Sequence, residues 1–290
     1  MKVLVFGQTG QVAVELARRA GPMGRQIDTL GRDRADLTDP AVCAAAVMAT
    51  DAHAVINAAA YTAVDQAESE PVTARTVNAD APGAIARACA ARGLPLLHIS
   101  TDYVFDSSGD RPWQEGDATS PLGVYGQTKL DGERQVQAAG GPHVILRTAW
   151  VFSAHGKNFV KTMLRLGRDR PALNVVADQQ GGPTPAADIA DALLTIAAAF
   201  RQGKGQSGIF HFAGAPATTW AGFAEAIFDT ATLPNRPTVT RIATVDYPTP
   251  ARRPGNSILD CSKIACVYGI AQPDWRIGLS DVLRELETAP

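Results

Sequence analysis

Short apolar runs alternate with longer stretches of helical periodicity along the first half of the chain. The runs lie at residues 2–6 ("KVLVF"), 53–60 ("HAVINAAA"), 94–100 ("LPLLHIS") and 143–148 ("HVILRT"). They have the length and the branched composition of buried strands, and apolar residues at helical spacing fill the segments between them. Strands that alternate with helices predict βαβ units in a parallel sheet. We therefore expect an α/β fold, a Rossmann-type doubly wound parallel sheet, with ligands bound beyond the carboxyl ends of its strands.

The second half of the sequence predicts a smaller substrate-binding region. A helix should follow "DQQGGP", with Thr184 as its N-cap and Pro185 at its first position. "TTWAGFAEAIFDTA" predicts an amphipathic helix in which Trp220 is a core anchor. We place a Rossmann domain at residues 1–150 and the substrate-binding region at 151–290, with the two interleaved.

Composition and charge exclude several classes of protein. The 290 residues are 46% hydrophobic, which is enough for a substantial core, but they contain no apolar stretch that approaches a membrane span. The formal charge of -2 leaves no basic surface for nucleic acid. Met1 leads directly into an apolar strand with no signal-peptide pattern, so we expect a cytoplasmic protein. Nucleic acid and membranes are not expected partners.

The four cysteines predict neither a metal site nor a redox motif. They contain no C-x-x-C pair, and no histidine pair at zinc-site spacing accompanies them. Buried free thiols are the expected state. The residues are Cys43, Cys89, Cys261 and Cys266.

A glycine-rich segment follows the first predicted strand. "FGQTGQVA" has the form G-x-x-G-x-x-A, with Gly7, Gly10 and Ala13. Gly7 suits a tight turn, Gly10 lets backbone amides approach a pyrophosphate, and Ala13 lets the helix pack on the strand. A purely structural turn is the alternative, but the position between strand and helix favours a nucleotide site.

The end of the second predicted strand bears on the choice of cofactor. An acidic residue at this point would accept a hydrogen bond from the ribose of NAD, but the expected position is Leu30, followed by Gly31 and Arg32. Arg32 could pair with the 2′-phosphate of NADPH. Asp33 lies next to it, and Arg32 could instead be a solvated loop charge. We expect NADPH as the preferred cofactor, with NADH as the alternative.

Polar groups suited to proton transfer follow the third and fourth strands. Thr101 ends the fourth strand, and a loop rich in Gly, Pro and Asp leads to a helix, expected to start near Pro121, that carries Tyr125 and Lys129. Residues four apart share a helix face, so the lysine should lower the pKa of the phenol and prepare it for proton transfer. A surface pair is the alternative for Tyr125 and Lys129 on their own, but the neighbouring motifs favour a site. The run of alanines at 58–60 could approach a flat cofactor or could reflect core packing.

Taken together, these motifs resemble the dTDP-4-dehydrorhamnose reductase family of the extended short-chain dehydrogenase/reductase superfamily. The resemblance runs nearly end to end, and it is most specific from "STDYVF" to "KLDGE" and at "TPARRP". It implies NAD(P)H-dependent reduction of the C4 ketone of a dTDP-4-dehydro-6-deoxy-L-mannose to dTDP-L-rhamnose. The implied partner is therefore a small-molecule dTDP-sugar.

The resemblance also implies roles for individual residues. Tyr125, Lys129 and Thr101 match the catalytic positions, and Thr101, Asp102, Trp150 and Arg252 match positions near the substrate. Arg253 is a second candidate for the diphosphate; for both arginines, a solvated or structural role is the alternative, in a segment ("YPTPARRPGNS") whose prolines oppose regular structure. The cofactor positions are Gly7, Gly10, Gln11, Val12, Arg32, Asp36, Leu37, Ala60, Tyr61, Thr62, Tyr125 and Lys129.

Some members of this family are magnesium-bridged dimers that use glutamates. Here Ala187 stands where one such glutamate would align, and Asp188 is one residue away, about 100° around the helix. Glu15 and the C-terminal "LRELE" remain possible ligands. We expect no metal site, and a monomer or weak homodimer. A nucleotide-sugar epimerase and a non-catalytic regulatory relative are the alternative functions.

Overall fold

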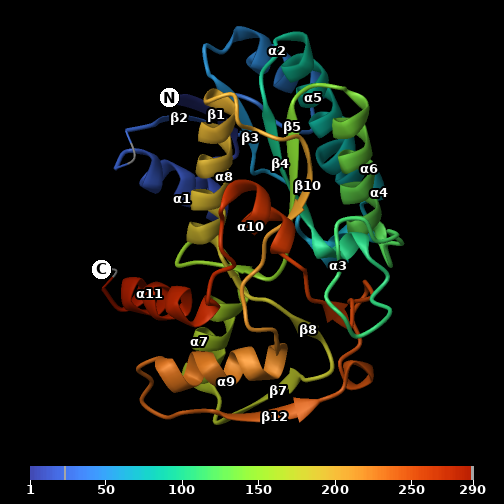
Figure 1. The fold of residues 1–290 in the computed structure, drawn as a ribbon. Helices are drawn as coiled ribbons and strands as arrows, with labels where there is room; N and C mark the ends of the chain where they lie inside the picture. The colour runs from blue at the N-terminus through green and yellow to red at the C-terminus, as the bar shows by residue number, and fades with distance from the viewer. Residues whose placement is uncertain (23, 289–290) are drawn as a thin grey trace.

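The computed structural model describes residues 1–22 and 24–288, which form two regions (Figure 1). The larger region contains a six-stranded sheet in the order β10-β5-β4-β3-β1-β2, and all of its neighbouring strands are parallel. Its strands are β1 (Lys2–Phe6), β2 (Gln26–Leu30), β3 (Ala54–Asn57), β4 (Leu96–Thr101), β5 (His143–Thr148) and β10 (Gly208–His211). The predicted Rossmann-type parallel sheet is confirmed.

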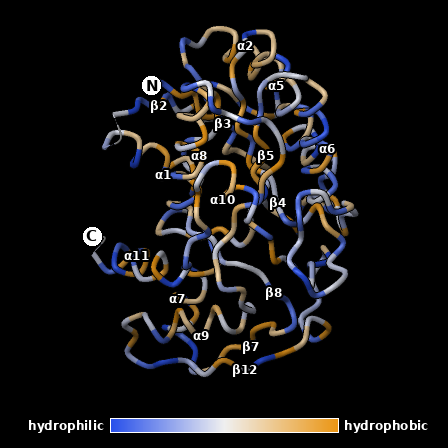
Figure 2. The backbone as a smooth tube through the Cα atoms, viewed as in Figure 1, coloured by the Kyte–Doolittle hydropathy of each residue, from blue (hydrophilic) through white to orange (hydrophobic). Residues whose placement is uncertain are grey.

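Helices cover both faces of this sheet. The side chains of β1 alternate between two cores, with Val3 and Val5 in one and Leu4 and Phe6 in the other, as the two-residue period of a strand requires. Helices α1 (Gln11–Ala20) and α8 (Ala186–Arg201) pack on the first face. Helices α2 (Pro40–Ala49) and α5 (Ala81–Ala91) pack on the second, and α6 (Val124–Ala138) lies beside α5. In Figure 2 hydrophobic, orange stretches lie among the strands at the centre of the larger region.

The sheet order creates a place for a ligand. Strand β2 lies on one side of β1 and β3 on the other, so the connections diverge at the carboxyl ends of β1 and β3. Open α/β sheets bind ligands in the crevice at such a switch point. The glycine loop after β1 therefore stands where a nucleotide would bind.

The smaller region has its own core around Phe152, Phe223 and Trp275. It contains helices α7 (Phe159–Asp169), α9 (Trp220–Thr230) and α11 (Trp275–Thr288). Its short strands are β6 (Val151–Phe152), β7 (Ala172–Val176), β8 (Gln180–Gly181), β9 (Thr184–Pro185), β11 (Thr218–Thr219), β12 (Thr238–Ile242) and β13 (Asn256–Ser257). The chain after residue 150 also supplies α8 and β10 to the six-stranded sheet and its cover (Figure 1).

Short helices complete the fold. The α-helices are α3 (Val64–Ala67), α4 (Pro71–Arg75) and α10 (Ser262–Tyr268), with a π-helical turn at Thr76–Asp80 and 3₁₀ turns at Asp102–Val104 and Thr244–Asp246. Over the described ranges, no helix combines the length and the apolar character needed to cross a bilayer.

Two predicted helix starts are wrong, because the local residues expected to begin or cap each helix bond or lie elsewhere. Helix α6 begins at Val124 rather than near Pro121, and Glu68 Oε1 accepts a 2.9 Å hydrogen bond from the Val124 amide. Helix α8 begins at Ala186, after Pro185. The Thr184 hydroxyl does not cap it but donates to the Gly182 carbonyl at 2.9 Å. In both cases the local sequence signal lay within three residues of the true start.

Two smaller expectations also need correction. Burial raises the pKa of the thiols of Cys43, Cys89 and Cys261, as expected for buried cysteines, but Cys266 is exposed on α10. Regular structure is absent over residues 247–255, as "YPTPARRPG" predicts, but the following Asn256–Ser257 pair forms strand β13.

Candidate active site

The turn after β1 requires glycine. Gly7 has φ +114°, a backbone conformation that side chains disfavour, and its amide donates to the Leu30 carbonyl at 3.0 Å. Gly10 is the N-cap of α1, and no side chain caps the helix there. The first backbone amides of α1 are therefore not bonded by a capping side chain. They lie at the helix N-terminus, the end of a helix that attracts anions.

The next two residues have side chains that are already engaged. Gln11 Oε1 accepts hydrogen bonds from Ser153 Oγ at 2.9 Å and Asn158 Nδ2 at 3.0 Å. Val12 is buried in the core under the sheet. Any contact of Val12 with a pyrophosphate would use its backbone amide, while the Gln11 side chain joins α1 to the second half of the chain.

The end of β2 presents an exposed cation. Leu30 is its last residue, as expected, and Arg32 is exposed just beyond it. Asp36 Oδ1 accepts a 2.9 Å hydrogen bond from the Thr38 amide, which together with the nearby charge of Arg32 lowers the pKa of the Asp36 carboxyl. Leu37 is buried beneath this turn.

The segment after β3 is held by Asn78, which the sequence analysis did not identify. Asn78 Oδ1 accepts from the Tyr61 amide at 2.8 Å, and its Nδ2 donates to the Tyr61 carbonyl at 3.1 Å and to Thr128 Oγ1 at 3.2 Å. Asn78 thereby fixes the segment that contains Ala60, Tyr61 and Thr62 against α6. A single buried asparagine within a helical stretch carries no sequence signal for this role.

Thr101 and Asp102 meet at the carboxyl end of β4. Thr101 Oγ1 donates to Asp102 Oδ1 at 3.1 Å and accepts from the Tyr103 amide at 3.2 Å. Asp102 is 2% exposed, and burial raises the pKa of its carboxyl to about 6, although hydrogen bonds from Ser257 and Thr101 oppose the shift. Among the described residues, Asp102 Oδ2 has no hydrogen-bond partner.

Tyr125 lies on the first turn of α6, close to these two groups. Its ring meets the ring of Tyr103 edge to face, with centroids 5.4 Å apart. Burial raises the pKa of the phenol to about 12, a hydrogen bond with Thr101 lowers it, and the charge of Asp102 raises it further. The expectation that Lys129 lowers this pKa is wrong for this arrangement, because the buried lysine points elsewhere.

Lys129 is buried one turn further along α6. Its Nζ donates to the Ile99 carbonyl at 2.7 Å and lies 3.5 Å from His98 Nε2. Burial lowers the pKa of the ammonium to about 8, and the charge of Glu133 on the same helix opposes that shift. The two residues lie one turn apart on α6 beside β4, and Lys129 bonds the strand backbone rather than the phenol.

Trp150 and Trp220 form a stacked pair on the substrate-region side. Their ring centroids are 3.6 Å apart, and Trp150 has φ +49°, which is uncommon for an aromatic residue. A Cβ at Gly181 would lie 2.6 Å from the Trp150 ring, so only glycine fits there. Gly181 pairs with Ser257, the residue that bonds Asp102, so one short sheet links Trp150 to the end of β4.

The two arginines of "TPARRP" differ in their contacts. Arg252 is exposed, whereas Arg253 Nη2 pairs with Asp65 Oδ2 at 2.7 Å. Asp65 also accepts from the Ala251 amide at 3.1 Å, so it holds this segment against the chain after β3. Asp65 is a second residue that the sequence analysis did not identify.

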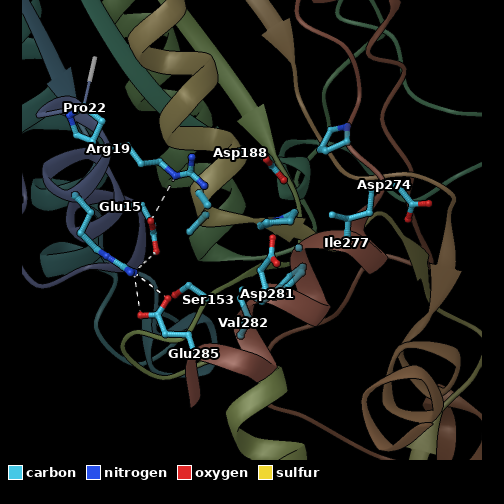
Figure 3. Close-up of a pocket in the computed structure, with 17 residues that line it drawn as sticks. Glu15, Arg19, Pro22, Ser153, Asp188, Asp274, Ile277, Asp281, Val282 and Glu285 are labelled. Atoms are coloured by element: carbon cyan, nitrogen blue, oxygen red, sulfur yellow. Dashed lines mark hydrogen bonds and ion pairs between the residues drawn. The ribbon is translucent and has the colours of Figure 1, made fainter. Parts of the chain in front are cut away.

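A charged cavity lies apart from Thr101, Tyr125 and Lys129, between α1, α8 and α11 (Figure 3). Its volume is about 520 Å³, and Glu15, Asp188, Asp281 and Glu285 are among the residues that line it. The helical offset of Asp188 from Ala187 suggested that Asp188 faces away from the Ala187 position. This is wrong, because both residues border this cavity.

Three residues in or beside this cavity that could ligate a metal already share a cation. The ligand atoms of Glu15, His155 and Glu285 lie within 4.8 Å of one another. Arg18 Nη1 lies 3.1 Å from Glu15 Oε1, 2.9 Å from Glu285 Oε1 and 2.8 Å from His155 Nε2. A magnesium ion would have to displace this guanidinium, and a histidine nitrogen is a poor ligand for it. The set does not fit a bridging magnesium ion.

Comparison with known proteins agrees with this geometry. The family described as "RmlD substrate binding domain" matches residues 1–288. The dTDP-4-dehydrorhamnose reductase of Sinorhizobium fredii is 44% identical, with 95% of this chain and 94% of the relative covered, and that of Escherichia coli K12 is 42% identical, with 99% of each covered. A crystal structure of the Bacillus anthracis dTDP-4-dehydrorhamnose reductase in complex with NADP superposes with a TM-score of 0.91 at 32% identity, covering 98% of this chain and 99% of that one. The chain belongs to the dTDP-4-dehydrorhamnose reductase family.

Proposed function

We propose that this protein uses a reduced nicotinamide cofactor to convert the C4 ketone of dTDP-4-dehydro-6-deoxy-L-mannose into the alcohol of dTDP-L-rhamnose. The observation that carries the proposal is the meeting of Thr101, Tyr125 and Lys129 at the carboxyl end of β4, in a chain of this reductase family. The glycine turn after β1 stands at the same edge of the sheet. A nucleotide at that turn and a sugar at β4 would occupy one crevice.

Tyr125 is the proton donor in this proposal. Burial and Asp102 keep its phenol protonated, so it can hydrogen-bond to the ketone oxygen and release its proton as negative charge develops there. The Thr101 hydroxyl donates to Asp102 here, and we propose that it turns this donor to the same oxygen when the ketone is bound. When bound, the reduced nicotinamide supplies the hydride that C4 receives. Lys129, whose pKa is lowered to about 8, can hold or release a proton near the working pH and can bind the cofactor ribose.

The cofactor contacts follow from the same placement. Backbone amides at the start of α1 would bind the pyrophosphate, and Arg32 would pair with a 2′-phosphate, which favours NADPH over NADH. The contacting residues are proposed to be Gly7, Gly10, Gln11, Val12, Arg32, Asp36, Leu37, Ala60, Tyr61, Thr62, Tyr125 and Lys129.

The substrate contacts lie on the other side of the crevice. Thr101, Asp102 and Trp150 are proposed to contact the sugar, since one short sheet links Trp150 to Asp102 through Gly181 and Ser257. Arg252 is exposed and is proposed to bind the diphosphate, while Arg253, paired with Asp65, holds the segment in place. We propose a monomer or weak homodimer without a bridging metal, because Arg18 already occupies the centre of the charged cluster.

The reaction is tested by following the loss of reduced nicotinamide absorbance with dTDP-4-dehydro-6-deoxy-L-mannose. Tyr125→Phe should lower kcat by ~100-fold or more, because the proton donor is removed. Tyr268→Phe on α10 is the matched control and should leave kcat unchanged, since the Tyr268 hydroxyl bonds the backbone of Gln206 in the loop before β10. Absence of dTDP-L-rhamnose as a product of the unmodified protein would refute the proposal.

Cofactor preference is tested at Arg32. Arg32→Gln should raise the KM for NADPH about 10-fold and leave that for NADH nearly unchanged, because only NADPH carries the 2′-phosphate. Arg34→Gln is the control, since Arg34 is occupied by Asp28 at 2.8 Å. An equal effect of Arg32→Gln on both cofactors would show that Arg32 does not read the phosphate.

A further inference from the structure

The proposed reaction leaves unexplained a histidine buried directly behind the catalytic lysine. His98 is 0% exposed, and its Nε2 lies 3.5 Å from Lys129 Nζ. Its Nδ1 lies 3.1 Å from Nδ2 of Asn57, the residue opposite it on the neighbouring strand β3. An imidazole buried within the sheet, between an amide and an amine, costs free energy unless both of its nitrogens form hydrogen bonds.

The hydrogen bonds around Asn57 determine which imidazole nitrogen carries the proton. Asn57 Oδ1 accepts a 3.2 Å hydrogen bond from the Ala59 amide, so the side-chain nitrogen is the atom that faces His98. An amide nitrogen only donates, and His98 Nδ1 must therefore accept. The neutral imidazole then carries its single proton on Nε2, the atom that faces Lys129.

Burial keeps this imidazole neutral. It lowers the pKa of His98 well below the ordinary value, and the positive charge of Lys129 acts in the same direction. A doubly protonated His98 would also turn an N–H toward the side-chain N–H of Asn57. Two donors would then face each other, so this contact disfavours the charged imidazole in addition to burial.

The orientation of His98 bears directly on Lys129. An ammonium offers only N–H groups, one of which is used on the Ile99 carbonyl at 2.7 Å, and it cannot accept from Nε2–H. A neutral amine has a lone pair that can accept it. The imidazole therefore favours the neutral form of the lysine, as burial does.

The other charged groups around Lys129 are accounted for. On α6, Tyr125 precedes it by one turn, and Glu133 follows it and favours the ammonium. Arg147 of β5 binds Glu133 through two hydrogen bonds of 2.9 and 2.6 Å and so reduces the effect of that carboxylate. Asp102, after β4, acts on Tyr125.

We infer that His98 is a positioning residue for the proposed reduction: oriented by Asn57, it presents Nε2–H to Lys129 Nζ and sets how readily Lys129 holds its proton. Nothing in this arrangement requires His98 to touch substrate or cofactor. His98 acts through Lys129. The expected effect of His98 on catalysis rests on the proposed role of Lys129, whereas its effect on the ionisation of Lys129 does not.

The first test is the tautomer in the unmodified protein. ¹⁵N NMR of histidine-labelled protein should show a protonated Nε2 and an unprotonated Nδ1 for His98, unchanged from pH 6 to 9. A proton on Nδ1 would overturn the inference. This measurement needs no turnover, so its outcome is separate from that of the proposed function.

The second test is the ionisation of Lys129, followed by NMR in protein labelled with ¹³C at lysine Cε and assigned with Lys129→Met. His98→Phe removes the donor and keeps a planar ring, so the titration midpoint of Lys129 should rise by ~0.5–1 pH unit. The basic limb of the kcat/KM profile should move in the same direction. His143→Phe, at the first residue of the neighbouring strand β5, is the control and should leave the titration midpoint of Lys129 unchanged.

The sign of the midpoint shift decides between the two orientations of the imidazole. A midpoint that falls or does not move in His98→Phe would show that Nε2 accepts from the ammonium or has no influence, and either result would overturn the inference. If His98→Phe does not fold, the tautomer of the unmodified protein decides the question.

Discussion

Two glutamate–arginine pairs in this protein have nearly the same geometry and very different surroundings. Arg147 binds Glu133 through two hydrogen bonds of 2.9 and 2.6 Å, and Arg241 binds Glu225 through two of 3.0 and 2.6 Å. The side chains of the first pair are 2% and 1% exposed, and those of the second are 55% and 31% exposed. The distances are equivalent, so any difference between the pairs comes from burial.

The buried pair is part of the support behind the candidate active site. Ser100 Oγ donates to Glu133 Oε1 at 2.5 Å, and the Arg147 guanidinium lies 5.1 Å from the centre of the Phe105 ring. Glu133 lies one turn after Lys129, so it holds α6 against β4 and β5 where Thr101 ends the strand. The exposed pair instead joins α9 to β12 at the surface of the smaller region. Ion pairs of similar geometry can thus support a site when they are buried and only join surface elements when they are exposed.

The largest expected effect comes from breaking the buried pair. Glu133→Gln should lower the free energy of unfolding by about 3–5 kcal/mol, because Arg147 would remain buried without a counter-charge. Glu225→Gln should cost only about 0.2–1 kcal/mol. Urea denaturation of both variants measures the difference, and similar losses would contradict the importance of burial.

Asp102 sharpens the comparison, because it is a buried carboxylate that forms no ion pair with any described residue. Burial raises the pKa of Asp102 to about 6 from an ordinary 3.8, so the folded protein holds this proton more tightly than the unfolded chain. Stability should therefore fall as the pH rises from about 4 to 6, with a full cost on the order of 2–3 kcal/mol above that range. Asp102→Asn should remove this dependence and be more stable than the unmodified protein at pH 7, while losing activity.

Urea denaturation at pH 4, 5, 6 and 7 tests the Asp102 prediction. Asp106→Asn is the control of opposite sign, because Asp106 is only half-buried and its hydrogen bonds from Ser108 lower the pKa of its carboxyl. If the curves of the unmodified protein and of Asp102→Asn run parallel across this range, Asp102 does not titrate as described.

A smaller effect than that of Asp102→Asn is expected at the half-exposed cluster in which Arg18 pairs with Glu15 and Glu285. Arg18→Gln should lower the free energy of unfolding by about 0.5–1 kcal/mol, and less in high salt, because solvent screens the cluster. Magnesium chloride or EDTA at matched ionic strength should not change the melting temperature of the unmodified protein. Arg284→Gln, whose only recorded ion pair among the described residues is with Asp281, is the control on α11.

A melting temperature that rises with magnesium in the unmodified protein would show that the ion displaces Arg18. A rise confined to Arg18→Gln would agree with the assignment of the guanidinium as the cation of this cluster.

Hydrophobic periodicity was enough to predict the parallel sheet, and motif spacing was enough to indicate the glycine turn and the polar groups after β4, whereas the substrate positions came from the family resemblance. Gly7, Thr101, Tyr125 and Lys129 follow strand ends or share a helix face, and both relations can be read along the chain. Asn78 and Asp65 could not be found in this way. Each acts through contacts with segments remote in sequence, 17 and 186 residues away respectively, and an isolated buried polar residue has no local pattern.

The sequence by itself therefore determined the alternation of strands and helices in the first half, the glycine turn and the chemical groups available for proton transfer, because these depend on near neighbours in the chain. The tertiary structure decided the state of those groups. It raised the pKa of Tyr125 where the sequence suggested lowering, turned Lys129 toward β4 and His98, and placed Arg18 among the glutamates that could have held a metal. Ionisation and ligand choice depend on burial and on which distant side chains meet, and only the folded chain fixes both.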